Sequence, residues 1–188
     1  MRIIIYVPGI HEDEKNGLIN TLSSISNVDF ILFSPWSSIE ELEELNLNSL
    51  HEKLLALIKE KSAENQVFLA GRSFGGGIAL TLNSDLIKGI ILFAPAIKFS
   101  TVNEFKKDVL FKNIKGFFEK SVNKEFIDLL SVPILIFHDE ADKKIPFSNS
   151  ERMSESCNNI KLIRCQKGHN FENSKELNMY IMKWLDEI

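Results

Sequence analysis

Cysteine is scarce in this sequence, which has only Cys157 and Cys165 among its 188 residues. Two cysteines are too few for a disulfide framework, and neither belongs to a CxxC or Cys/His pattern with the spacing of a zinc site. We therefore expect two reduced thiols and no bound metal.

Long hydrophobic runs are also absent. No segment comes near the roughly 18 consecutive apolar residues that a membrane-spanning helix needs. The amino-terminal stretch MRIIIYVPG has one basic residue and only five consecutive apolar positions before Pro8. That is too short for the apolar core of a signal peptide, and no small-residue cleavage site follows it. The sequence predicts a cytoplasmic protein without a membrane span.

The chain has no excess of positive charge. Its 22 basic and 26 acidic residues give a net charge of −4 and are spread along the whole sequence. Nucleic-acid binding domains normally carry a basic patch or stripe, which is missing here. We expect a small-molecule partner and no nucleic acid.

No internal repeat, low-complexity tract or Gly/Ser/Pro linker divides the chain, so we predict one domain over residues 1–188. The one irregular region is 98–130, which holds six of the 14 phenylalanines, Phe111 and Phe117 among them. This region is at most a small cap. Two interpretations stay open: the rings form an apolar wall of a substrate pocket, or they are the buried face of an ordinary crossover helix.

Short apolar, β-branched runs alternate with segments of helical periodicity. The runs lie at 2–7, 28–33, 66–70, 88–94, 132–138 and 160–165. Apolar residues fall on one helical face at Leu50, Leu54, Leu57 and Ile58, and again at Leu177, Ile181, Trp184, Leu185 and Ile188. This alternation predicts an α/β fold with about six mostly parallel strands and helices on both faces of the sheet.

A glycine-rich turn follows the third run, where residues 70–77 read AGRSFGGG. Gly71, Ser73 and Gly75 fit the pattern G-x-S-x-G, whose glycines make room for a sharp strand-to-helix turn that exposes a nucleophilic serine. The pattern alone is weak, but here a strand precedes it and a helix-compatible segment follows. The simpler alternative is a turn with a solvated serine.

A serine nucleophile needs a histidine base. His169 follows the sixth run and precedes the last helix, which puts it beyond the carboxyl end of a strand, where ligands bind in open α/β sheets. The other histidines have simpler explanations: His51 as a solvated helix residue, His138 as packed at a strand end, and His11 as a loop residue.

The histidine needs an acid to orient it, and three carboxyl groups compete on the loop after the fifth run. They are Asp139, Glu140 and Asp142. The best candidate is Asp142, and the order Ser73, Asp142, His169 is the chain order expected of an α/β-hydrolase.

The chain resembles the small α/β-hydrolases over nearly its whole length. The family's acid motif often reads H-G-x-x-D-x-x-V-P, and residues 138–146 read HDEADKKIP, with Asp139 in place of the glycine and Asp142 as the acid. The family's histidine commonly follows a glycine in a loop before the final helix, and the Gly168-His169 pair fits this pattern. The resemblance implies a chain that starts at the family's third strand, as in dienelactone hydrolases and carboxylesterase-like proteins.

The same resemblance implies an oxyanion hole made of two backbone N–H groups. One belongs to Phe74, which follows the nucleophile, and the other to Ile10, although Pro8-Gly9-Ile10 stands where the family usually has His-Gly-x. Because the backbone donates, the changed side chain need not remove the hole. With Arg72 beside the serine, the stretch GRSFGG resembles that of a subgroup of predicted hydrolases. Arg72 itself is expected to form an ion pair or a helix-end contact.

Together these residues predict a serine hydrolase for carboxylic esters or thioesters that needs no cofactor. Its partner would be a small-molecule acyl ester or thioester. Two alternatives stay open: the same triad could serve an acyltransferase or a peptidase, or the fold could serve a non-catalytic binding or scaffold protein.

Overall fold

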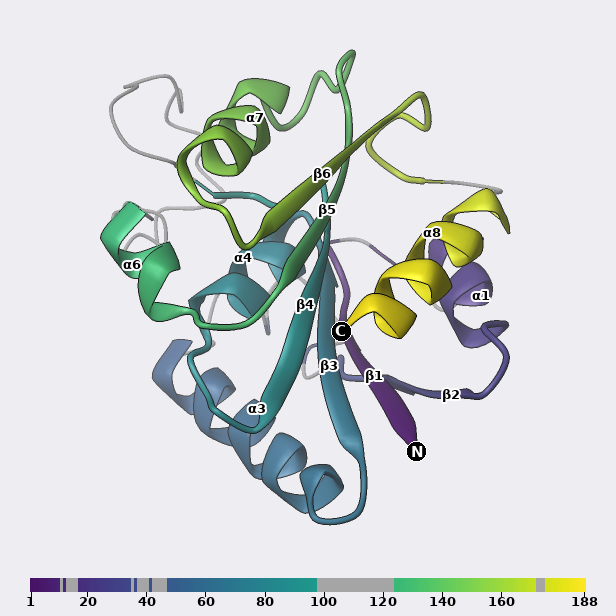
Figure 1. The fold of residues 1–188 in the computed structure, drawn as a ribbon, viewed down its shortest axis with the longest axis vertical. Helices are drawn as coiled ribbons and strands as arrows, with labels where there is room; N and C mark the ends of the chain where they lie inside the picture. The colour runs from purple at the N-terminus through teal and green to yellow at the C-terminus, as the bar shows by residue number, and fades with distance from the viewer. Residues whose placement is uncertain are drawn as a thin grey trace.

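The computed structural model describes residues 1–10, 12, 17–34, 36, 41, 47–97, 124–171 and 175–188 (Figure 1). Strands and helices alternate along these residues, as the sequence predicts. The strands are β1 (Arg2–Val7), β2 (Val28–Leu32), β3 (Gln66–Arg72), β4 (Ile87–Phe93), β5 (Ile134–Asp139) and β6 (Ile160–Cys165). The helices are α1 (Gly17–Ser23), α3 (Leu47–Ser62), α4 (Phe74–Thr81), α6 (Lys124–Leu129), α7 (Phe147–Ser156) and α8 (Lys175–Glu187).

The six strands form one sheet in the order β2-β1-β3-β4-β5-β6, and every neighbouring pair is parallel. The predicted sheet is confirmed, and it is entirely parallel in the described residues. The chain first moves from β1 to β2 and then returns to place β3 on the other side of β1. In open parallel sheets such a switch point leaves a crevice at the carboxyl ends of the strands, where ligands bind.

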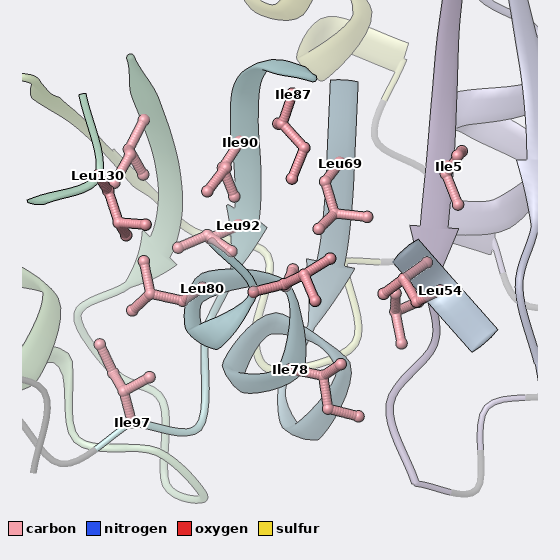
Figure 2. Close-up of a cluster of buried hydrophobic side chains, with 14 of the residues drawn as sticks. Ile5, Leu54, Leu69, Ile78, Leu80, Ile87, Ile90, Leu92, Ile97 and Leu130 are labelled. Carbon is pink, nitrogen blue, oxygen red and sulfur yellow. The ribbon is translucent and has the colours of Figure 1, made fainter. Parts of the chain in front are cut away.

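Successive strand residues face opposite layers of helices. In β1, Ile3 and Ile5 belong to one buried cluster, whereas Ile4 and Tyr6 belong to the other. The first cluster also holds residues of α3, α4, α6 and α7, and the second holds residues of α1 and α8. Figure 2 shows part of the first cluster, with Leu54 of α3 and Ile78 of α4 on the side of the sheet that Ile5 and Leu69 face. Burial on both faces explains why these strands are nearly continuous apolar runs.

The two predicted helical faces are confirmed with one exception. Leu50, Leu54 and Ile58 of α3 are buried, and Leu57 is partly buried against the same cluster. Leu177, Ile181, Trp184 and Leu185 of α8 are buried too. Ile188, which periodicity puts on the same face, is 50% exposed because α8 ends at Glu187. Within the described part of the chain, no helix is both long enough and apolar enough to cross a membrane.

The predicted cap region lies mostly outside the described residues. Of 98–130, the structure describes only 124–130, which includes the short helix α6. Ile127 and Leu130 in this part are buried in the first cluster. Phe111 and Phe117 lie outside the described residues, so the two interpretations of the phenylalanine-rich segment stay open.

We expect Leu54→Ala to lower the free energy of unfolding by about 2–5 kcal/mol, because a fully buried leucine would leave a cavity between α3 and the sheet. The measurement is urea unfolding followed by circular dichroism. The neighbouring Lys53→Ala is the control, since Lys53 is exposed and its loss should change the free energy by no more than about 0.5 kcal/mol. Equal effects of the two changes would contradict this packing.

Candidate active site

Four of the predicted site residues follow different strands at the carboxyl edge of the sheet. Ile10 follows β1, Ser73 follows β3, Asp142 follows β5 and His169 follows β6. Since all strands are parallel, their carboxyl ends lie at one edge. β1 and β3 are the pair at the switch point, so Ile10 and Ser73 follow the two strands where open parallel sheets usually bind ligands.

Ser73 occupies a sharp turn between β3 and α4. Its backbone has φ 51° and ψ −118°, a conformation that costs a non-glycine residue about 1–3 kcal/mol. Three backbone hydrogen bonds hold it there: the Ser73 N–H donates to Phe93 O (2.9 Å), and the Ser73 carbonyl accepts from Ala96 (2.8 Å) and Gly77 (3.1 Å). The end of β4 and the first turn of α4 therefore stabilise the strained conformation.

The Ser73 side chain is not used as a helix cap. A serine at the N-terminal boundary of a helix usually accepts a hydrogen bond from a backbone N–H of the first turn, but Ser73 makes no such bond to α4. The residue is partly exposed. A capping role therefore does not account for a serine at this position.

Glycines allow the turn to pack closely against its neighbours. A Cβ atom on Gly71 would overlap the Gly75 carbonyl, and one on Gly75 would overlap the carbonyl oxygens of Val7 and Pro8. The first turn of α4 thus lies directly on the end of β1. The G-x-S-x-G spacing that the sequence offered has this steric cause.

His169 and Asp142 are brought together by the fold. The His169 Nδ1 atom lies 2.8 Å from Asp142 Oδ2, and the Asp142 side chain is fully buried while that of His169 is 10% exposed. The other carboxylate oxygen, Oδ1, accepts the backbone N–H groups of Lys144 (2.7 Å) and Ile145 (3.1 Å). The carboxylate is therefore anchored by its own loop and directed at the imidazole.

These contacts keep Asp142 ionised. Burial by itself raises the pKa of this carboxyl, but hydrogen bonds from His138 and His169 and from the two backbone N–H groups outweigh burial. The net effect is a pKa well below the usual range. A permanent negative charge thus lies beside Nδ1 of His169.

His138 is a second histidine beside the same carboxylate. It is completely buried, with Nε2 3.5 Å from Asp142 Oδ2 and 3.2 Å from the Ile145 carbonyl, and Nδ1 2.8 Å from Ser150 Oγ. The sequence indicated packing at the strand end, which is confirmed. Its contact with the acid was missed, since only the turn from β5 into α7 brings the groups together.

The structure separates the three competing acids by what they touch. Only Asp142 contacts the imidazole of His169. Asp139 is buried and binds backbone, accepting from the Ala141 N–H (2.7 Å) and from the Gly168 N–H (2.6 Å). Glu140 is exposed and pairs with Arg164. Asp139 therefore links the end of β5 to the loop that carries His169.

The loop after β1 presents backbone N–H groups near the turn. The Gly9 N–H donates to Glu12 Oε2 (2.7 Å), and the Glu12 N–H donates to the Gly9 carbonyl (3.3 Å). Among the described residues, none accepts a hydrogen bond from the Ile10 N–H. Phe74, whose N–H is the other predicted donor, begins α4 and is buried.

A buried ion pair lies next to the turn at Ser73, and the sequence indicated only one of its two members, Arg72. Arg72 Nε donates to Glu12 Oε2 (2.8 Å), with side chains 5% and 0% exposed. The Tyr6 hydroxyl also donates to Glu12, and burial together with the Glu12 charge raises the pKa of Tyr6 well above its ordinary value. The predicted ion pair of Arg72 is confirmed. Its partner, Glu12, lies 60 positions earlier beside two other acids, and no local sequence pattern distinguishes it from them.

Other groups in the described residues suggest no second site. No cluster of His, Cys, Asp and Glu side chains there is arranged to hold a metal ion. Burial raises the pKa of Cys165 to about 12, so its thiol stays protonated. A cavity of about 430 Å³ lies between β6 and α8, lined by Ile163, Cys165 and Tyr180 among others, and includes none of the predicted site residues.

Comparison with known proteins identifies the fold. No protein-family model and no curated protein matches the sequence. Est1E from Butyrivibrio proteoclasticus with ferulic acid bound superposes with a TM-score of 0.81 at 18% identity, over 100% of this chain and 89% of that one. The carbazole-degradation serine hydrolase CarC gives 0.73 at 16% identity, over 100% and 92%. Mouse α/β hydrolase domain-containing protein 10 gives 0.69 at 16%, over 98% and 90%.

These likenesses establish the α/β-hydrolase fold for this chain. The similar structures include esterases and other serine hydrolases. At 13–18% identity the comparison concerns the fold, and the chemistry has to be argued from this chain's own residues.

We expect Asp142→Asn to lower the free energy of unfolding at pH 7 by about 1.5–3 kcal/mol, the value of a hydrogen bond to a charged group. The folded-state pKa lies below the unfolded value of about 3.9, so the contribution is complete above that value and is lost as pH falls further. Urea unfolding of both proteins from pH 7 to pH 2 should show the difference narrowing below about pH 4. Asp85→Asn, which removes an exposed carboxylate, is the control. A difference that is independent of pH would contradict the assignment.

Proposed function

We propose that this protein is a serine hydrolase that cleaves carboxylic esters or thioesters through an acyl-enzyme intermediate. The observation that supports this most is the buried Asp142 carboxylate 2.8 Å from Nδ1 of His169, at the sheet edge where Ser73 occupies its strained turn. A carboxylate on Nδ1 leaves Nε2 as the basic nitrogen of the neutral imidazole. That is the arrangement that activates a serine hydroxyl.

In the acylation step, Ser73 Oγ attacks the acyl carbon while its proton moves to Nε2 of His169. The carbonyl π electrons move onto oxygen, and the oxyanion is held by the backbone N–H groups of Ile10 and Phe74. The tetrahedral intermediate then expels the alcohol or thiol, which takes the proton from the imidazolium. The product of this step is the Ser73 ester.

In the deacylation step, a water molecule loses its proton to Nε2 of His169 and attacks the same acyl carbon. The second tetrahedral intermediate collapses, Ser73 Oγ leaves and takes the proton back, and the carboxylic acid departs. The ionised Asp142 stabilises the imidazolium in both steps. The low pKa of its carboxyl keeps this charge present throughout the physiological pH range.

The substrate is proposed to be a small acyl ester or thioester. The fold neighbour Est1E holds ferulic acid, a carboxylic acid of the kind that ester cleavage releases. Phe111 and Phe117, the proposed apolar wall, lie outside the described residues, so their role stays a prediction. We further propose that residues 1–188 form one domain, that it acts in the cytoplasm, and that it uses no cofactor.

We expect Ser73→Ala to lower kcat for p-nitrophenyl ester hydrolysis by about 10⁴ to 10⁶, as the loss of a triad member does. The same change should abolish labelling by a fluorophosphonate probe, which reacts only with an activated serine. The partly exposed hydroxyl caps no helix, so the urea midpoint should stay near that of the wild type.

The chain offers Ser84→Ala as the matched control, because Ser84 lies on the loop after α4 and should leave activity and labelling intact. An alanine variant at position 73 that kept more than about a tenth of wild-type activity would require another nucleophile. A wild type that neither hydrolyses esters nor reacts with the probe would favour a binding protein on this fold.

We expect Asp142→Asn to lower kcat by about 10⁴, because the amide would orient His169 in the wrong tautomer. Asp139→Asn should have a much smaller effect, since within the described residues its carboxylate accepts hydrogen bonds from the Ala141 and Gly168 N–H groups and has none with His169. Steady-state kinetics of the two variants on one ester decide between them. A larger loss for Asp139→Asn would transfer the role of the acid to that residue.

A further inference from the structure

The Arg72 guanidinium contacts two loops that the sequence keeps far apart. Its Nε donates to Glu12 Oε2 in the loop after β1, 60 residues away. Its Nη1 donates to the His169 carbonyl (3.2 Å) and to Asn170 Oδ1 (3.1 Å), in the loop after β6. Arg72 itself ends β3 directly before Ser73. One side chain, next to Ser73 in sequence, thus joins the Glu12 side chain of one loop to the His169 backbone of the other.

Glu12 extends the same contacts to the predicted oxyanion donor. Its Oε2 accepts the Gly9 N–H at 2.7 Å as well as Arg72 Nε at 2.8 Å, and the Tyr6 hydroxyl donates to both carboxylate oxygens. The guanidinium also packs over Gly9, where a Cβ atom would come within 3.0 Å of Arg72 Nη2. Glu12 therefore binds the Gly9 N–H, and the Arg72 guanidinium covers Gly9 itself. Both contacts restrain the peptide that leads into Ile10.

Burial makes this arrangement specific. With side chains 5% and 0% exposed, the two charges have left water and depend on the partners they have. A guanidinium presents its donors in a rigid planar fork, so it fixes the relative position of the groups that it binds. A lysine at this position would offer a point charge that is unable to span Glu12 and the His169 carbonyl in the same way.

We propose that Arg72 and Glu12 are positioning residues for the proposed hydrolysis, which hold the His169 backbone and the Gly9-Ile10 peptide in register with Ser73. This inference rests on the proposed function. Neither side chain touches the reacting atoms. Their role is to keep the base and the oxyanion donor at the distances that proton transfer and charge stabilisation need, since a misplacement of about 1 Å can cost about 10²-fold in rate.

The alternative is that the pair only stabilises the fold, and four variants distinguish the two. They are Arg72→Lys, Arg72→Met, Glu12→Gln, and the double variant Glu12→Gln with Arg72→Met. Glu12→Gln leaves the buried Arg72 charge without its partner, so it should lower both kcat and the urea midpoint. We expect Arg72→Lys to fold and to lower kcat by about 10-fold to 10²-fold while KM changes less than about threefold, because the defect lies in the alignment of the catalytic groups. The rate of fluorophosphonate labelling should fall in parallel.

Comparison of the single and double variants separates stability from alignment. Arg72→Met leaves a buried, unpaired Glu12 charge and should lower the urea midpoint strongly. The double variant removes that charge, so the midpoint should recover relative to Arg72→Met while kcat stays low. Recovery of kcat together with the midpoint would overturn the proposal. Wild-type kcat in Arg72→Lys would overturn it as well.

Two further measurements complete the test. Arg2→Met removes an exposed arginine–aspartate pair at the opposite end of β1 and should leave kcat unchanged. Amide hydrogen exchange of residues 168–171 should be faster in Arg72→Lys than in wild type, while exchange in α8 stays unchanged because this variant keeps the charge beside Glu12. Equal exchange rates in residues 168–171 would overturn the tether, by which we mean the hold of Arg72 on the loop that carries His169. This readout needs no activity, so it tests the tether even if wild-type protein hydrolyses no ester, an outcome that would contradict the proposed function instead.

Discussion

The close approach of α4 to the end of β1 is the constraint on which the candidate site depends. Gly75 lies against the carbonyl oxygens of Val7 and Pro8, with no room for a Cβ atom. This contact brings the first turn of α4, and Ser73 before it, against the loop that carries Ile10. A strained Ser73 persists because its N–H bonds to Phe93 at the end of β4 and its carbonyl accepts from Ala96 and from Gly77 of α4. Sterics therefore bring Ser73, the proposed nucleophile, next to the loop of Ile10, the proposed oxyanion donor.

Buried charge organises the other half of the site. Transfer of an ion out of water costs several kcal/mol unless its hydrogen-bonding capacity is satisfied. The Asp142 carboxylate meets this condition with two backbone N–H groups and His169, and Glu12 meets it with Tyr6, Gly9 and Arg72. Because each ion needs several partners from different loops, the loops at this edge have few alternative arrangements.

The loop of His169 shows how packing and charge act together. Asp139 holds the Gly168 N–H, Arg72 holds the His169 carbonyl, and Phe171 is buried against Phe93 with ring centroids 5.4 Å apart. The backbone is thus tied on three sides around a histidine whose side chain remains partly accessible. Restraint of the backbone together with access for a ligand is the combination that a general base needs.

The sequence by itself determined the features that depend on local pattern. Apolar runs buried on both faces predicted the six parallel strands, and glycine spacing predicted the turn at Ser73, because side-chain period and steric room are properties of neighbouring residues. The acid motif favoured Asp142, but the contact between Asp142 and His169 and the partner of Arg72 were decided by the tertiary structure. Asp139, Glu140 and Asp142 share one loop, and only the direction in which that loop leaves β5 points one of them at an imidazole 27 residues away. Glu12 likewise has no sequence pattern that marks it. Its partner Arg72 lies 60 residues away, and the two meet only because β1 pairs with β3.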